Sequence, residues 1–366
     1  MSKARELASL GNAYSDGALS NRNLIINGAM QVAQRGTSAT GVTANSYKTV
    51  DRFEYHAKGT MTGQVTFEQS SDAPSGFKNS AKLTVTTTDT YAVNEYVALP
   101  QYIEGYNIAP LGFGTSGAKP FTISFWVKAS IVGEYSVAFQ NSDNTRNFLH
   151  TYNVDVANTW EYKTMTIPAD TGGTWPTENT TGLKVWISLG SGSDYAESST
   201  LSTWQTNLVL GSANGVKLLE NAGATWQITG VQLEVGDTAT PFEHRSYGQE
   251  LALCQRYFNR YGTQNGFTLL VPSINGGTTN ARCGVPLSTK LRATPTVTPS
   301  ASNAIVIRNH GSFSNYASTS IALGNEQQIE PNLIALSVTV ASGLVSASVN
   351  IPYINTGHHL DFDAEL

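Results

Sequence analysis

Charged side chains are scarce in this chain. Asp, Glu, Lys and Arg make up 13% of its 366 residues, about half of the usual share of about 25%. The formal net charge is -5, and Lys and Arg form no stripe along the sequence. This argues against a nucleic-acid-binding protein, which needs a basic surface to neutralise phosphates. Ser, Thr, Asn and Gly take the place of the missing charged residues. The polar, weakly charged surface that they predict suits neutral hydroxylated ligands or contacts between copies of the chain.

Cysteine and long apolar runs are equally scarce. Cys254 and Cys283 are the only cysteines, and two isolated thiols make no disulfide framework, so we expect both to be reduced and buried. No stretch approaches the ~18 apolar residues of a membrane span, so we expect no membrane insertion. The N-terminus, M-S-K-A-R-E-L-A-S-L-G, also lacks the apolar core of a signal peptide.

Motifs for catalysis, cofactor binding and metal binding are missing. The sequence has no G-x-S-x-G, Walker, G-x-G-x-x-G, H-E-x-x-H or C-x-x-C pattern. We therefore predict no catalytic residue, no cofactor and no metal centre. A glycosidase would need two carboxylates about 5–10 Å apart, and none of the candidates stands out: Asp51, Glu54, Asp143, Asp155, Asp194 and Glu197. A structural calcium ion beside Asn27 and Glu234, where the first and last strands of a sandwich would meet, stays open as an alternative.

The stretch from Trp226 to Phe258 predicts a domain boundary. Alternating apolar residues predict a strand that Gly230 interrupts as a bulge and that ends by Pro241. Ser246 is then placed to cap a helix, with Gln249 as its capping-box partner. We predict a connecting helix over 244–262.

Short strands bounded by Gly, Pro, Asn and Ser precede and follow this helix. We predict an all-β chain: an antiparallel jelly-roll β-sandwich over 23–243 and a second, smaller β domain over 263–366. In the latter, Asn332–Val340 and Leu344–Ile351 are predicted to pair as a hairpin. Residues 1–22 are predicted to be a short helix and a linker, and a helix this short needs a partner to be stable.

Three sequence motifs carry a resemblance. They are N-R-N-L-I-I-N-G-A-M-Q-V-A-Q-R-G from Asn21, with V-D-R-F from Val50; V-Q-L-E-V-G-D-T-A-T-P-F-E-H-R-S-Y-G-Q-E-L-A-L-C-Q-R-Y-F from Val231; and the terminal L-D-F-D-A-E-L. Together they resemble tail-fibre proteins of marine and cyanobacterial bacteriophages and related prophages, with a sandwich similar to a carbohydrate-binding module.

The resemblance implies a non-enzymatic, homotrimeric tail-fibre subunit that attaches the virion to host glycan. Residues 1–22 would join other tail or baseplate proteins, and the C-terminal domain would be the receptor-binding tip. Such a protein is located in the virion, assembled in the host cytoplasm and released by lysis. A glycan-degrading tailspike and a non-viral carbohydrate-binding module are the alternatives.

Aromatic residues indicate where a sugar would bind, because sugar CH groups stack on exposed rings. In the ranges 121–128 and 183–189, alternation turns Trp126, Lys128, Trp186 and Lys184 away from the apolar face, which predicts one shared binding surface. The alternative is that a loop or a neighbouring chain covers these rings. Further candidates lie in polar, turn-rich segments: Trp175 and Tyr195, with Trp160 and Trp204 in similar surroundings.

Overall fold

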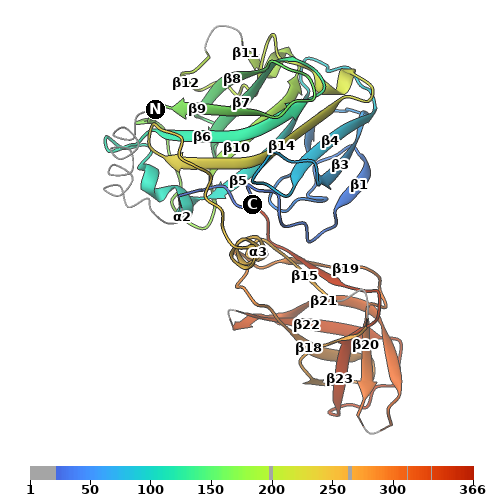
Figure 1. Ribbon diagram of the computed structural model, residues 1–366. Coiled ribbons are helices and arrows are strands. Elements are labelled where there is room, and N and C mark those ends of the chain that lie inside the picture. The colour runs from blue at the N-terminus through green and yellow to red at the C-terminus, as the bar shows by residue number, and fades with distance from the viewer. Residues whose placement is uncertain (1–21, 198–200, 263–265, 311, 331) are drawn as a thin grey trace. The chain divides into compact units, whose positions relative to one another are not determined.

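The protein folds into two compact units. The computed structural model describes residues 22–197, 201–262, 266–310, 312–330 and 332–366 (Figure 1). The first unit ends at Glu250, and the second extends from Leu251 to Glu365. The division lies within the stretch predicted to connect two domains. The predicted N-terminal helix lies outside the described residues. Among those that are described, no helix is long and apolar enough to span a membrane.

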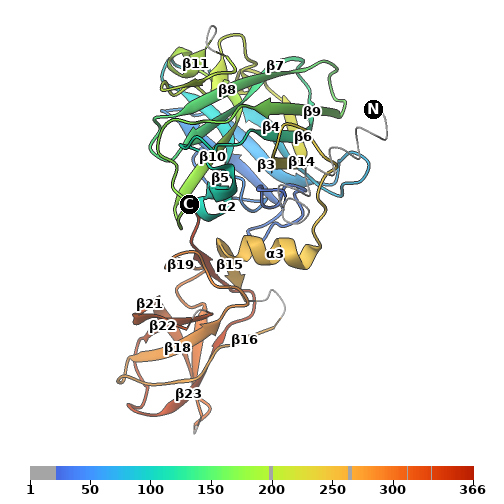
Figure 2. The same cartoon turned by 90° about the vertical axis from the view of Figure 1, so that its left-hand side faces the viewer.

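The first unit is a sandwich of two antiparallel, six-stranded sheets, which Figure 2 shows as two layers. The first sheet has the order β1 (Ser38–Val42), β3 (Gln64–Ser70), β4 (Ser80–Thr87), β14 (Thr225–Val235), β6 (Phe121–Ala129) and β9 (Glu161–Ile167). The second sheet has the order β12 (Trp204–Gln205), β8 (Asn147–Val154), β7 (Gly133–Asn141), β10 (Thr181–Ser191), β5 (Tyr96–Glu104) and β2 (His56–Lys58). The all-β sandwich predicted from the sequence is confirmed.

Short elements complete the first unit. They are α2 (Gly105–Ile108), η1 (Ala109–Leu111), η2 (Ser193–Tyr195), η3 (Leu218–Glu220), and the parallel pair β11 (Ala196–Glu197) and β13 (Gly211–Ser212). The segment that carries η2, β11, β12 and β13 is the longest connection in this unit, and it returns over the outer face of the second sheet.

Strand β14 lies in the middle of the first sheet, between β4 and β6. Its Trp226 and Ile228 before the bulge, and Val231 and Leu233 after it, are all fully buried in the core. Gly230 has a φ of 63°, and the pairing with β6 shifts at this point. The glycine bulge predicted from the sequence is therefore confirmed, and it lets one strand keep a single apolar face along its whole length.

The second unit holds two further sheets. The smaller has the order β15 (Phe258–Tyr261), β24 (Leu360–Asp363) and β19 (Thr296–Pro299). The larger has the order β16 (Thr268–Leu269), β23 (Val349–Ile354), β20 (Ile305–Asn309), β21 (Asn315–Glu330), β22 (Leu333–Val340) and β18 (Asn280–Pro286), and β17 (Ser273–Ile274) pairs with β23.

The predicted hairpin in the second unit is wrong. Strand β22 has the predicted alternation, but it pairs with β21 and β18, whereas β23 pairs with β20 and with β16 and β17. The chain between β22 and β23 is tied down elsewhere, because the Asn275 side chain donates a hydrogen bond to the Val345 carbonyl oxygen at 2.9 Å. The alternation therefore predicted β22 correctly, but it placed the second strand too early and gave the wrong pairing. Residues 344–348 form no strand, and β23 begins at Val349.

The connecting helix is shorter than predicted. Helix α3 spans Tyr247–Gln255, and the residues predicted to extend it to 262 form β15 instead. Its capping box is as expected. The backbone N–H of Gln249 donates to Ser246 Oγ at 3.4 Å, and the backbone N–H of Ser246 donates to Gln249 Oε1 at 3.1 Å. Cys254 and Cys283 form no disulfide and are both buried, as predicted, and burial raises the pKa of Cys283 to about 12.

Candidate functional site

The two predicted tryptophans do not share a surface. Trp126 and Lys128 lie on β6 of the first sheet, whereas Trp186 and Lys184 lie on β10 of the second. Both tryptophans point away from the core, as alternation predicted. Because the two sheets are the opposite layers of a sandwich, their outward faces point in opposite directions. The prediction of one shared surface is therefore wrong.

Trp186 is not available to a ligand. Only 5% of it is exposed, because it packs in a separate apolar cluster with Leu149, Val209 and Leu210 on the outer face of the second sheet. The rings of His56, Tyr96 and Tyr102 meet it edge-on, with centroid distances of 5.1 to 5.9 Å. The alternative considered from the sequence, that a long connection covers this ring, is the one that the structure shows.

The remaining candidates have structural partners too. Trp175 is 7% exposed and packs against Phe113 and Trp204 at 4.8 and 5.6 Å. The Tyr195 ring packs on Tyr96 at 4.9 Å. From β10, Lys184 donates hydrogen bonds to two residues of the turn after β7. The acceptors are the Ser142 carbonyl oxygen at 2.9 Å and Asn144 Oδ1 at 2.6 Å. Burial lowers the pKa of Lys184. These side chains hold loops against the sandwich.

Trp126, in contrast, belongs to a partly open aromatic surface. Its neighbours Phe125 and Val127 are fully buried in the core, so Trp126 points outward. Tyr162 lies directly opposite on β9, and the two rings are 5.3 Å apart at an angle of 46°. Tyr162 is 45% exposed, so its ring offers a face to which a ligand can bind.

The bulge at Gly230 extends this surface across β14. A Cβ atom at Gly230 would lie 2.7 Å from the Phe77 ring and 3.2 Å from Trp126, so the missing side chain lets these two rings approach each other. Phe77 contacts Phe242 at 5.0 Å and His244 at 5.3 Å. Phe77 and Phe242 are half-buried and His244 is exposed. The rings therefore continue from β9 over β6 to the segment that follows β14.

A charged cluster lies at the β9 end. Asp72 accepts hydrogen bonds from Lys128 Nζ at 2.7 Å, Trp160 Nε1 at 3.2 Å and Gln227 Nε2 at 3.2 Å. Lys128 Nζ also lies 5.9 Å from the centroid of the Trp160 ring. Partial burial alone would raise the pKa of Asp72, but these hydrogen bonds outweigh it and hold the pKa below its ordinary value. We call Trp160, Tyr162, Trp126, Phe77, Phe242 and His244 the aromatic strip.

Sequence reasoning found Trp126 and Lys128 but missed most of the strip. Tyr162 had a usable signal, because it alternates outward on its strand as Trp126 does. Phe77, Asp72 and Phe242 had none, because they lie in connecting segments, where no strand alternation indicates which way a side chain points. Trp160 was noted only for its polar surroundings, and the structure adds its hydrogen bond to Asp72.

The candidate carboxylates for catalysis are dispersed. Asp51 is 1% exposed and accepts hydrogen bonds from Gln34, and burial raises its pKa despite the nearby Arg35. Glu54 accepts a hydrogen bond from the Tyr102 hydroxyl at 3.0 Å and lies 3.1 Å from His56 Nδ1. Asp155 lies 3.4 Å from Lys163 Nζ. These three acids therefore have structural partners within the protein.

The positions considered for calcium have protein partners. The Asn27 side chain donates to the carbonyl oxygens of Val32 and Asp51, and Glu234 accepts from Gln232 and Thr240. Within the part of the chain that the structure describes, no three His, Cys, Asp or Glu side chains are grouped as metal ligands. A structural calcium ion stays a prediction without a tested site.

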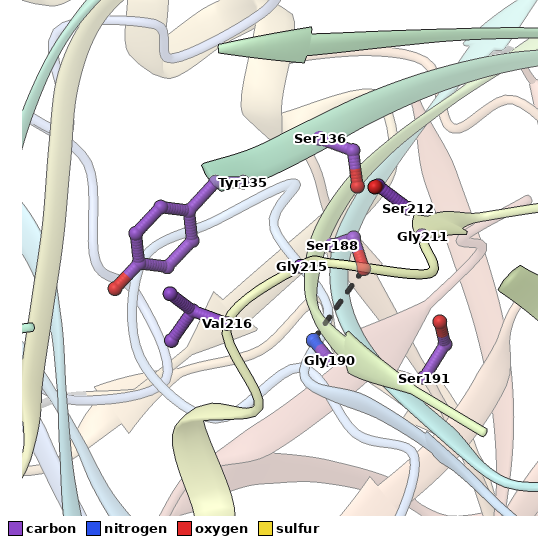
Figure 3. Close-up of a pocket in the computed structure, with 9 residues that line it drawn as sticks. All are labelled: Tyr135, Ser136, Ser188, Gly190, Ser191, Gly211, Ser212, Gly215 and Val216. Atoms are coloured by element: carbon purple, nitrogen blue, oxygen red, sulfur yellow. Dashed lines mark hydrogen bonds between the residues drawn. The ribbon is translucent and has the colours of Figure 1, made fainter. Parts of the chain in front are cut away.

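A small cavity opens on the outer face of the second sheet (Figure 3). It is lined by Ser136, Ser188, Ser191 and Ser212, with glycines between them, and its volume is about 10 Å³. That volume holds about one water molecule. Ser191 Oγ is buried and has no protein partner, so one water would satisfy it. The cavity is too small for a sugar ring.

Comparisons with known proteins show distant likenesses. No protein-family model matches the sequence, and no curated protein matches it. Among solved structures, the enzymatically active domain of tailspike protein 4 of bacteriophage CBA120 is 13% identical, with a TM-score of 0.28, over 58% of this chain and 21% of that one. The chain thus matches about a fifth of that tailspike protein's length.

Two carbohydrate-binding modules are also similar. A CBM4 structure is 19% identical, with a TM-score of 0.30, over 57% of this chain and 97% of that one. The family 11 carbohydrate-binding module of a cellulosomal cellulase of Clostridium thermocellum is 12% identical, with a TM-score of 0.25, over 56% of this chain and 98% of that one.

Proposed function

We propose that the chain is a non-enzymatic glycan-binding protein and that the aromatic strip is its binding surface. The observation that carries the proposal is a run of half-exposed rings on one sheet face, with a carboxylate and an ammonium group at one end. Rings of this kind stack on the CH groups of pyranoses, and the charged pair supplies hydrogen bonds to hydroxyl groups. A soluble protein seldom leaves such a surface open without a use for it.

The biological setting of the proposal is a bacteriophage tail fibre. Its support is the resemblance of the motifs around Asn27, Asp51, Glu243 and Leu360 to tail-fibre proteins. In that setting the chain would be one subunit of a homotrimer in the virion and would attach the particle to a host-surface glycan. The second unit remains the proposed receptor-binding tip, and the strip adds a glycan contact in the first unit.

Replacing Tyr162 with alanine is expected to weaken glycan binding about fivefold, because one stacking contact supplies about 1 kcal/mol. Binding to host-surface polysaccharide can be measured by affinity electrophoresis. Tyr106→Ala is the matched control, since Tyr106 is 59% exposed and Tyr162 is 45% exposed, but Tyr106 lies on α2, outside the strip. Equal binding by the two variants would remove the strip as the binding surface.

The oligomeric state tests the tail-fibre setting. We expect light scattering on the purified full chain to give three times the mass of one chain. A monomer would contradict the fibre subunit and leave a free-standing carbohydrate-binding module. A reducing-sugar assay on the same polysaccharide tests the non-enzymatic part, because a tailspike enzyme would release new reducing ends and a binding protein would not.

A further inference from the structure

The lysines near the Trp160 end of the strip are already paired with carboxylates of the protein. Lys128 and Asp72 form an ion pair at 2.7 Å, with 19% and 43% of their side chains exposed. On the neighbouring strands of the same sheet, Lys82 is paired with Glu68 at 2.8 Å. A ligand that reaches this end of the strip therefore meets ammonium groups that already have a carboxylate partner.

An anionic sugar would fit this end poorly. To reach Lys128, a sugar carboxylate or phosphate would have to lie beside Asp72, which stays ionised because its hydrogen bonds hold its pKa below the ordinary value. Two negative charges a few ångströms apart repel each other. Displacing Asp72 would also leave Trp160 Nε1 and Gln227 Nε2 without their acceptor.

A neutral sugar fits well, because hydroxyl groups can both donate and accept. The Asp72 carboxylate has about four acceptor positions, and hydrogen bonds from Lys128, Trp160 and Gln227 fill three of them. An ammonium group has three N–H donors, and Asp72 takes one of those of Lys128. The pair therefore offers one free acceptor and two free donors beside the Trp160 ring, which match neighbouring hydroxyl groups of one pyranose.

We propose that the strip selects an uncharged polysaccharide and that the Asp72–Lys128 pair is the element that makes this selection. The inference rests on the proposed function, since it names the ligand class of the same site. The rings contribute contact area along the sugar chain, and the ion pair recognises the hydroxyl groups of the unit that lies on Trp160. Because no net charge is exchanged, binding should depend little on salt.

The test uses the full chain on an array of neutral and acidic microbial oligosaccharides, at 50 and 500 mM NaCl. The expected result is binding to neutral members only, nearly equal at both salt concentrations and weakened in Tyr162→Ala. Salt-sensitive binding of acidic members that Tyr162→Ala also weakens would overturn this inference and leave the proposed function standing. Binding to no member, or binding that Tyr162→Ala leaves unchanged, would overturn both.

Asp72→Asn tests the pair directly. It keeps the shape of the side chain but leaves Lys128 without its counter-charge, so neutral binding is expected to fall on the order of tenfold, while acidic members begin to bind in low salt. Glu220→Gln removes the carboxylate of the Lys217 pair at η3, on other elements than those that carry the strip, and is expected to change neither. A purely structural role for Asp72 would lower neutral binding without any gain for acidic glycans, and that result would overturn the inference.

Discussion

Trp186→Ala is expected to lower the free energy of unfolding of the first unit by about 3–5 kcal/mol, the usual cost of removing a buried aromatic side chain. The ring is 5% exposed and fills the space between the second sheet and the connection that covers it. Its Nε1 donates to Gln140 Oε1 at 3.2 Å, so truncation also leaves a buried amide oxygen without this donor. For a unit of this size the change corresponds to a shift in Tm of about 10 °C.

Trp126→Ala is the control for this prediction. Trp126 is half-buried and its outer side is open, so its removal should cost only about 1 kcal/mol of stability while weakening glycan binding. Denaturant unfolding followed by far-UV circular dichroism measures both variants. Equal losses of stability in the two variants would contradict the conclusion that Trp186 is covered and Trp126 is open. If Trp186→Ala instead binds glycan poorly at full stability, the second sheet carries the binding face.

Alternation along the chain predicted side-chain orientation but not strand partners. It showed that Trp126 and Trp186 both point away from the core, because successive side chains of a strand point to opposite faces. It could not show that β6 pairs with β9 and β14 while β10 pairs with β5 and β7. Pairing depends on the packing of the whole sandwich, and the same limitation explains the wrong hairpin in the second unit.

The positions of the connecting segments that cover the sheets could not be predicted from the sequence either. The connection that covers Trp186 contributes Val209 and Leu210. The connection between β3 and β4 contributes Asp72 and Phe77, and the Phe77 ring lies against β14 at Gly230. Both are polar, turn-rich stretches in which a few apolar residues have no period. Their positions follow from the sheet surface onto which they pack, so the sequence predicted the framework of the site and not its outer parts.

The motifs behind the family resemblance have a structural explanation. Asn23 and Glu243, more than 200 residues apart, share a hydrogen bond between the Asn23 N–H and Glu243 Oε2 at 2.9 Å. Arg245 donates to the carbonyl oxygens of Asn23 and Ile25. In the second unit, the Ala364 N–H of the third motif donates to the Tyr257 carbonyl oxygen of the second motif at 2.7 Å. The motifs thus join the beginning and end of each unit, and most of the aromatic strip lies outside them.

Asn27 is the residue of these motifs on which the largest effect is expected. It is fully buried with a φ of 61°, in the left-handed region that asparagine tolerates better than most residues. Its side chain accepts from the Val32 N–H at 2.9 Å and donates to the carbonyl oxygens of Val32 at 2.8 Å and Asp51 at 2.9 Å. Asn27→Ala should therefore cost about 4 kcal/mol, from backbone strain and from buried groups left without a partner.

Two further variants separate these causes in the same unfolding measurement. Asn27→Gly removes the hydrogen bonds but relieves the strain, so it should be less destabilising than Asn27→Ala by about 1 kcal/mol. Asn158→Ala introduces strain alone, because Asn158 has a φ of 56° but is exposed, and it should cost only about 1–2 kcal/mol. A loss in Asn27→Ala no larger than in Asn158→Ala would mean that the side-chain hydrogen bonds of Asn27 to Val32 and Asp51 contribute nothing to stability.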